Sequence, residues 1–337
     1  MKQRDIIVIG GSAGSLGVLK KLVGELPAHF PAAIFVVWHM ASDSPGTLAD
    51  VLDRNSKLPA KNAVNDEKIV NGHIYVAPPD HHLLIHDSRV RLSRGPKENR
   101  FRPAVDPLFR SAARWSGSRA VGVVLSGGLD DGTSGLWAIK EAGGATIVQD
   151  PYDAEAPSMP SNALARVAVD HCVPAIELAD LLVRLVNEQA QDVVEAEMEE
   201  NKRTEIESDI AEGDGTSQKD FLELGEPSLF ACPECHGVLL KITEGNNIRF
   251  RCHTGHGYSS GTLLAEITEA VEESLWNAAR ALDESFMLLD HFSEHLKDKD
   301  RELSKLYEEK ARRLEQRSLK VRELAIENGQ IAETNRE

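Results

Sequence analysis

The chain has 337 residues, 41% of them hydrophobic, which suffices for a substantial core and suggests two domains or one domain with appendages. The formal net charge is −16 and the 38 basic residues form no dense block, so nucleic acid is not an expected partner. No run of 18 apolar residues occurs, and the start, MKQRDIIVIG, lacks a signal-peptide pattern. We therefore expect no membrane insertion and a cytoplasmic location.

Strand-like and helix-like segments alternate over the first 190 residues. Helices are predicted at LGVLKKLVGEL, GTLADVLDRN and TSGLWAIKEAGG. The runs AIFVVW and AVGVVL are continuously apolar, which is typical of parallel strands covered on both faces. This alternation predicts an α/β fold with a mostly parallel sheet. The predicted strands are Ile6–Ile9, Ala33–Trp38, His73–Ala77, His82–His86, Ala120–Leu125, Ala145–Gln149 and His171–Val173.

A change of composition divides the chain further. The window from Glu195 to Asp214 holds nine acidic and two basic residues, so it cannot bury enough apolar surface to order itself. We therefore predict four parts: a first domain over 1–193, an acidic flexible linker over 194–227, a small module over 228–260 and a helical pair over 261–330.

The small module carries a metal-ligand pattern. Cys232 and Cys235 form a C-x2-C knuckle, and Cys252 and His256 follow as C-x3-H. A hairpin, VLLKI–EGNN–IRFRC, is predicted between the two pairs. Three Cys and one His match a closed tetrahedral zinc site, and a domain this small needs such a staple. The sequence therefore predicts a structural Zn²⁺.

Two further histidines and one further cysteine lie outside that set. His236 is a weaker alternative for the fourth ligand, and His253 is poorly placed because it adjoins Cys252. The remaining cysteine, Cys172, stands among apolar residues and is predicted to be a buried core thiol.

The last part of the chain has helical periodicity. Apolar residues recur every three or four positions from Leu264 to Leu296, and again from Leu303 to about Ala325. KDKDRE separates the two runs. This pattern predicts two antiparallel helices that serve docking or self-association.

The first predicted strand ends in a glycine-rich loop, IIVIGGSAGS. The loop fits no register of the dinucleotide pattern G-x-G-x-x-G, and the acidic residue expected at the end of the next strand is missing. It does match G-x-S-x-G over Gly10–Gly14, which would present Ser12 on a tight strand-to-helix turn.

Two more chemically active side chains follow predicted strands. His39 comes directly after AIFVVW, and Asp130 and Asp131 lie in the turn after AVGVVL. In an open parallel sheet these strand ends meet at one edge, where ligands bind. Each residue could singly serve a cap or a turn, but a Ser, a His and an Asp at one edge together favour a catalytic triad.

Six segments in this order resemble the catalytic domain of the bacterial chemotaxis protein-glutamate methylesterases: IIVIGGSAGS, WHM, IYVAPPDHHLLI, RFRPAVDPLFRSAA, VVLSGGLDDGTSG and IVQDPYDAEAPSMPSNAL. The resemblance covers roughly residues 3–190. It implies a Rossmann-like three-layer α/β/α fold and a carboxyl-ester hydrolase that needs no cofactor for catalysis.

The resemblance also implies residue roles. Ser12 would be the nucleophile, His39 the base, and Asp131 the orienting carboxylate, with Asp130 as the fallback. The N–H groups of Ala13 and Gly128 would bind the oxyanion. Gly128 stands where the family has Met.

The implied reaction is hydrolysis of glutamate γ-methyl esters on the cytoplasmic helices of chemoreceptors or similar signalling proteins, and some members of the family also deamidate glutamine there. Typical members begin with a receiver domain, whereas this chain begins at the catalytic strand, so we expect no control by phosphorylation in cis. Some relatives carry a similar zinc-ribbon tail and helical pair. Two alternatives are a non-enzymatic signalling or docking protein with this fold, and a hydrolase of another protein ester or amide.

Overall fold

The computed structural model describes residues 3–190, 198–213 and 218–334. It divides into a first compact unit that ends at Leu263 and a second that begins at Leu264. None of the helices in the described ranges is both long and apolar enough to cross a membrane.

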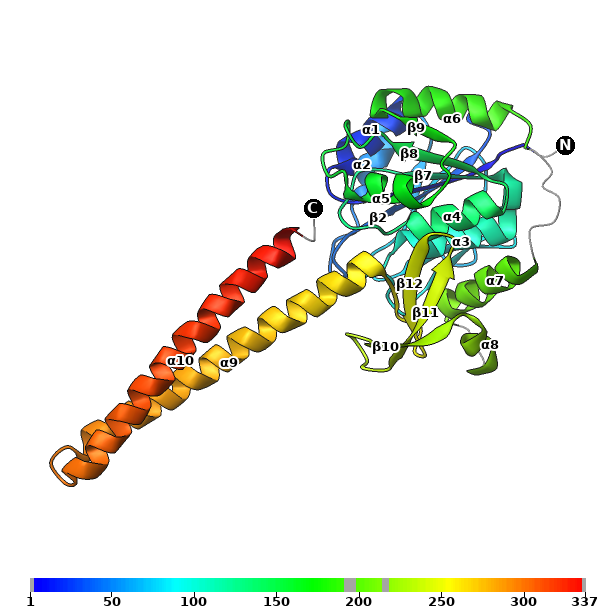
Figure 1. Cartoon of the computed structure of the whole chain (residues 1–337). Helices are drawn as coiled ribbons and strands as arrows, with labels where there is room; N and C mark the ends of the chain where they lie inside the picture. Colours follow the sequence, from blue (N-terminus) through cyan, green and yellow to red (C-terminus); the bar gives the residue numbers. More distant parts are fainter. Residues whose placement is uncertain (1–2, 191–197, 214–217, 335–337) are drawn as a thin grey trace. The chain divides into compact units, whose positions relative to one another are not determined.

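The first unit is built on a seven-stranded parallel sheet with the order β3-β4-β2-β1-β7-β8-β9 (Figure 1). All seven predicted strands form, although the fourth pairs outside this sheet. The short edge strand β3 was not predicted. The sheet strands are β1 (Ile6–Gly11), β2 (Ala33–Trp38), β3 (Ala60–Asn62), β4 (Ile74–Val76), β7 (Ala120–Val124), β8 (Ala145–Gln149) and β9 (His171–Val173).

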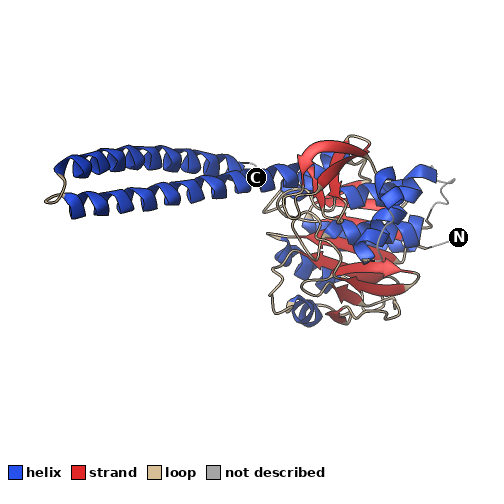
Figure 2. Ribbon diagram, turned by 90° about the horizontal axis from the view of Figure 1, so that it is seen from below, coloured by secondary structure: helices blue, strands red, loops and turns tan. Residues whose placement is uncertain are grey.

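Helices cover both faces of this sheet (Figure 2). Ile7 and Ile9 of β1 belong to one apolar core, which α1, α2 and α6 complete. Ile6 and Val8 belong to the other, which α3, α4 and α5 complete. The predicted α/β/α arrangement is therefore confirmed. These helices are α1 (Ser15–Glu25), α2 (Leu48–Asn55), α3 (Val105–Ser116), α4 (Thr133–Glu141), α5 (Ser158–Arg166) and α6 (Leu178–Asn187), with 3-10 turns at Gly117–Arg119 and Ala175–Glu177.

The acidic segment contains ordered structure that the sequence did not predict. Met198–Glu212 forms helix α7, and Gln218–Glu223 forms α8. In α7, Ile206, Glu207 and Ile210 are buried, and Figure 1 shows this helix beside α3. The expectation of a flexible linker is therefore wrong for α7 and for α8, because their few apolar residues pack in one buried cluster and Glu207 finds buried partners. Residues 194–197 and 214–217 of the predicted linker lie outside the described ranges.

A hairpin and a second sheet complete the first unit. Strand β5 (His82–His86) pairs with β6 (Arg89–Ser93), which was not predicted. The second sheet is antiparallel with the order β10-β11-β12-β13. We call it the appended sheet. Its strands are β10 (Glu226–Ala231), β11 (Val238–Glu244), β12 (Asn247–Cys252) and β13 (Gly257–Ser259).

The second unit is a helical hairpin made by most of α9 (Ser260–Leu296) and by α10 (Arg301–Thr334). Antiparallel pairing is shown by Asn328, whose Nδ2 donates to the carbonyl of Thr268 at 3.0 Å, and by Ser304, whose Oγ donates to the carbonyl of Ser293 at 2.8 Å. Helix α10 extends beyond the predicted range at both ends.

Candidate active site

Ser12 follows β1 at the carboxyl edge of the parallel sheet, as the sequence predicted. Its N–H donates to the carbonyl of Ser126 at 2.9 Å, and its own carbonyl accepts from Trp38 Nε1 at 2.9 Å. The loop after β7 runs directly beside it: a Cβ added at Gly127 would lie 2.9 Å from the Cβ of Ser12 and 2.1 Å from the sulfur of Met159. Glycine at position 127 therefore permits the close approach of the two strand ends.

His39 lies on the neighbouring strand end. Gly11 and Trp38 are register partners, and the N–H of His39 donates to the carbonyl of Gly11 at 3.1 Å. His39 and Ser12 therefore lie side by side at the carboxyl edge of the sheet. The Nε2 of His39 lies 2.7 Å from Oδ2 of Asp131. Its Nδ1 is buried and has no hydrogen-bond partner in the described part of the chain.

Asp131 is fully buried and accepts an unusually large set of hydrogen bonds. Besides His39, the N–H of Val105 lies 2.6 Å from Oδ2. Gly132 N–H and Asn99 Nδ2 each lie 2.9 Å from Oδ1. Burial alone would raise the pKa of Asp131, but the hydrogen bond and charge of His39, together with these donors, lower that pKa to about 2. The carboxylate is therefore held ionised.

Asp130, the fallback from the sequence, has a different environment. Its Oδ2 accepts from Arg166 Nη1 at 2.9 Å. Its Oδ1 accepts from the hydroxyls of Ser259 and Thr262. Of the two aspartates, Asp131 is therefore the one that contacts His39.

Three contributors to this site were not identified from the sequence. Phe101 stacks on the His39 ring, with centroids 3.8 Å apart and an interplanar angle of 8°. Asn99 binds Asp131, and Trp38 binds Ser12. Asn99 and Phe101 belong to a loop, residues 94–104, that follows no strand of the main sheet. The segment RFRPAVDPLFRSAA was the only signal for the end of that loop and for the helix after it.

The two expected oxyanion donors, Ala13 and Gly128, lie in the loops after β1 and β7. Hydrogen bonds tie these loops together, since Ser126 Oγ donates to the carbonyl of Ala13 at 2.8 Å. Among the residues described, neither the N–H of Ala13 nor that of Gly128 donates to a protein acceptor.

The four predicted metal ligands come together in the appended sheet. The ligand atoms of Cys232, Cys235, Cys252 and His256 all lie within 4.8 Å of one another. The sulfur atoms of Cys235 and Cys252 are 3.5 Å apart, and His256 Nδ1 lies 3.7 Å from the sulfur of Cys232. Tetrahedral Zn²⁺ with thiolate bonds of about 2.3 Å would separate its sulfurs by about 3.8 Å, so the set fits this ion.

The other candidates for that site are not part of the cluster. His236 and His253 are both exposed and are absent from the group of four. Cys172 is also exposed, so the prediction of a buried core thiol is wrong. It stands in β9, which ends the strand order of the parallel sheet and contains no buried residue.

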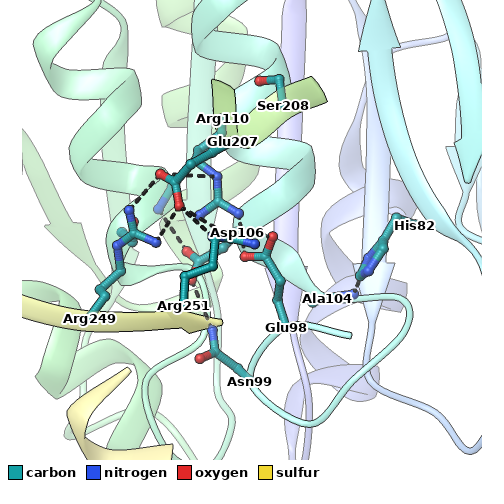
Figure 3. Close-up of polar contacts among 12 residues, drawn as sticks. His82, Glu98, Asn99, Ala104, Asp106, Arg110, Glu207, Ser208, Arg249 and Arg251 are labelled. Carbon is teal, nitrogen blue, oxygen red and sulfur yellow. Dashed lines mark hydrogen bonds and ion pairs between the residues drawn. The ribbon is translucent and has the colours of Figure 1, made fainter. Parts of the chain in front are cut away.

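A cluster of buried charges joins the appended sheet to the first domain (Figure 3). Arg249 makes a bidentate contact with Glu207 of α7, at 2.7 and 2.6 Å. Arg251 lies 2.8 Å from Glu98 and 2.9 Å from Glu207. Arg110 of α3 pairs with Glu98. All these side chains are at most 4% exposed, so each charge depends on its partners for compensation.

Comparison with known proteins identifies the family. A family model described as CheB methylesterase matches residues 7–182, which is more than half of the chain. The chain belongs to the CheB methylesterase family. Members of this family are carboxyl-ester hydrolases, so the expectation of an esterase family from the sequence motifs is confirmed. The appended sheet and the helical hairpin lie outside the matched residues.

Individual relatives agree with this CheB methylesterase assignment. A putative protein-glutamate methylesterase/protein-glutamine glutaminase of Leptospira interrogans is 38% identical over 182 residues, covering 54% of this chain and 94% of the relative. A protein-glutamate methylesterase/protein-glutamine glutaminase of Geobacter metallireducens is 41% identical over 177 residues, and the chain spans only 48% of its length. The crystal structure of the Thermotoga maritima CheB methylesterase catalytic domain matches with a TM-score of 0.52 and 34% identity, covering 55% of this chain and 100% of that one.

Proposed function

We propose that this protein is a serine hydrolase that removes γ-methyl esters from glutamates of chemoreceptor-like signalling proteins. The observation that carries the proposal is the buried contact of 2.7 Å between His39 and Asp131, beside the loop that holds Ser12. Relatives named protein-glutamate methylesterase/protein-glutamine glutaminase indicate the class of substrate. The helices of methylated chemoreceptors are the partners that this assignment implies.

The proposed mechanism assigns one role to each residue. His39 takes the proton of the Ser12 hydroxyl through its unpaired Nδ1, while the ionised Asp131 fixes the tautomer through Nε2. The serine oxygen attacks the ester carbonyl, and the N–H groups of Ala13 and Gly128 stabilise the oxyanion. The proton on His39 then passes to the departing methoxide, which leaves as methanol. Water, activated by the same imidazole, hydrolyses the acyl-enzyme and restores the Ser12 hydroxyl.

The same acyl-enzyme accounts for a second proposed reaction. If the substrate is a glutamine side chain, ammonia replaces methanol as the leaving group and the product is again glutamate. This deamidation needs no additional residue beyond Ser12, His39 and Asp131.

The experiment is an assay of methanol release from methylated receptor fragments. We expect release by the wild-type chain and a loss of at least about 10³-fold for Ser12→Ala. Ser285→Ala, which alters an exposed serine of α9, is the matched control and should retain full activity. Absence of release by the wild type would contradict the proposed function, and unchanged release by Ser12→Ala would contradict the triad.

We also propose that Cys232, Cys235, Cys252 and His256 hold a structural Zn²⁺. The chemistry of three thiolates and one imidazole within 4.8 Å supports this proposal. All four positions would be filled by protein, so the ion would stabilise the fold of the appended sheet and take no part in ester hydrolysis.

We propose that the helical hairpin serves docking or self-association. Large apolar side chains are exposed on it, including Met287, Leu288 and Phe292 of α9 and Leu319 of α10, and such side chains favour contact with another helix. Sedimentation of the full chain at increasing concentration tests self-association. A mass that stays at that of one chain would contradict it and leave docking to a different protein.

A further inference from the structure

Asn99 links the appended sheet to the candidate catalytic aspartate. It is only 4% exposed. Its Nδ2 donates to Oδ1 of Asp131 and to Oδ2 of Asp106, both at 2.9 Å. Its Oδ1 accepts from the N–H of Ser259 at 2.9 Å, and its own N–H donates to the carbonyl of Gly257 at 2.8 Å. The side chain therefore faces two carboxylates while strand β13 holds its other end.

The backbone of the 94–104 loop pairs with the same strand. Gly257 donates to the carbonyl of Lys97 at 3.2 Å, and Glu98 and Gly257 form a parallel bridge. The carboxylate of Glu98 also contacts Arg251 of β12. Consequently the appended sheet fixes this loop both through its backbone and through a buried ion pair.

The electrostatics explain why this amide is needed. Asp106 and Asp131 are buried side by side, with the N–H of Asp106 3.2 Å from Oδ1 of Asp131. Burial and the charge of Asp131 raise the pKa of Asp106 well above its ordinary value. Asn99 donates one N–H to each carboxyl, which reduces their mutual repulsion and orients both. The titratable and charged groups facing this pair are His39, His82, Arg110 and Glu98.

We infer that Asn99 is a positioning residue for Asp131, and that strand β13 of the appended sheet holds Asn99 in place. The inference rests on the proposed function and extends it: the appended sheet supports the active site. Strand β13 begins directly after His256, so the Cys/His cluster and Asp131 are joined by Gly257, Ser259 and Asn99.

The backbone of Asn99 guides the choice of variants. Its φ is 49°, in the left-handed region that Gly, Asn and Asp tolerate. Asn99→Gly removes the amide without backbone strain, and Asn99→Asp keeps the shape but replaces the donor with a carboxylate. The matched control is Asn65→Asp, because Asn65 is exposed and its Oδ1 accepts from the N–H of Leu92, which is not a residue of the candidate active site.

The test measures the pH dependence of kcat/KM for methyl-ester hydrolysis by full-length variants. Loss of a donor to Asp131 makes the His39–Asp131 pair take up a proton more readily, so the acid limb should move to higher pH. We expect a shift of about one pH unit for Asn99→Gly and a larger one for Asn99→Asp. KM should stay unchanged, and Asn65→Asp should overlay the wild type. An acid limb that does not move in either Asn99 variant would overturn the inference.

A second pair of variants tests the part played by β13. Ser259→Pro removes the N–H that binds Asn99, whereas Ser259→Ala keeps it. We expect the acid limb to move for Ser259→Pro only, and to move no further when Ser259→Pro is added to Asn99→Gly. Equal profiles for Ser259→Pro and Ser259→Ala would overturn the assignment to β13. If the Asn99 variants fail to fold, the comparison of Ser259→Pro with Ser259→Ala still tests the inference.

A measurement without substrate separates this inference from the proposed function. Proton uptake by His39 can be followed by NMR in protein with isotope-labelled histidine. If the wild type releases no methanol, the proposed function fails. A higher pH midpoint of His39 proton uptake in Asn99→Gly would still support the link between Asn99 and the His39–Asp131 pair. An unchanged midpoint would contradict that link.

Discussion

Asp130 and Asp131 are adjacent in sequence but have different partners. Asp131 contacts His39, while Asp130 pairs with Arg166. In the proposed mechanism Asp131→Asn would favour the wrong imidazole tautomer and lower kcat by about 10⁴-fold. Asp130→Asn, the matched control, should lose far less. Methanol release under saturating substrate measures both, and an equal loss in the two variants would contradict the assignment of Asp131.

The ionisation of Asp131 also contributes to stability. Its pKa is lowered to about 2 from an ordinary 3.8. A lowered carboxyl pKa contributes stability that is present above the unfolded-state value and is lost as pH falls toward the folded-state value. We therefore expect the free energy of unfolding to fall by about 2 kcal/mol from this group as pH drops from about 4 to about 2. Urea unfolding of Asp131→Asn should show a shallower decline over this window; a parallel decline would contradict the lowered pKa.

Single residues also show what the sequence could predict. The rule that parallel strands present their carboxyl ends at one edge was enough to bring Ser12, His39 and Asp131 to one region. It could not find Asn99 or Phe101, because their loop is positioned by contacts with the appended sheet and not by the main sheet. Gly10 is the first glycine of the G-x-S-x-G pattern, yet it lies within β1, where a Cβ would come 2.2 Å from Cγ1 of Val105.

Among the helices and strands, α7 differs most clearly from the expectation. Its composition is typical of a solvated linker, but Glu207 is fully buried among arginines from α3 and β12. Burial alone would raise the pKa of Glu207, but Arg249, Arg110 and Arg251 hold it well below the ordinary value. Glu207 and its arginine partners lie far apart in the sequence, so no local sequence pattern indicates that they pair. The composition of the segment therefore could not predict that α7 is buried.

The buried position of Glu207 leads to a stability prediction. Glu207→Ala leaves buried guanidinium groups without a partner and should destabilise the first unit by about 3–5 kcal/mol. Glu205→Ala on the same helix is the matched control: its side chain is 57% exposed, and the loss should be about 1 kcal/mol or less. Urea unfolding measures both. Equal effects would show that the buried charge cluster does not stabilise α7 and the appended sheet.

The appended sheet leads to a metal prediction. We expect about one zinc per purified chain, loss of that zinc in Cys232→Ser, and a lower Tm after treatment with a chelator. Cys172→Ser should keep its zinc, because Cys172 is outside the cluster. Elemental analysis measures the zinc content, and thermal unfolding measures the Tm. A wild-type protein that holds no zinc and whose Tm is unchanged by chelators would contradict the proposed site.

Across the described residues, regular patterns of secondary structure were predictable from the sequence, and tertiary contacts were not. Period-3.6 apolar spacing located α9 and α10, and strand alternation with the six motifs located the α/β domain. The appended sheet packs against Asn99 and α7 through buried charged side chains that come from segments far apart in the sequence. The first domain, the linker and the small module predicted as separate parts therefore lie within one compact unit that ends at Leu263.

In the proposed mechanism Ser12 forms the acyl-enzyme. This intermediate can be trapped by rapid acid quenching of the wild-type chain during turnover of a methylated peptide, followed by tryptic digestion and mass spectrometry. We predict that the tryptic peptide of residues 5–20, which contains Ser12, carries the substrate through an ester between the serine oxygen and the glutamate γ-carbonyl. We predict no such adduct in Ser12→Ala. Methanol release without this adduct, or an adduct on a different peptide, would contradict the account.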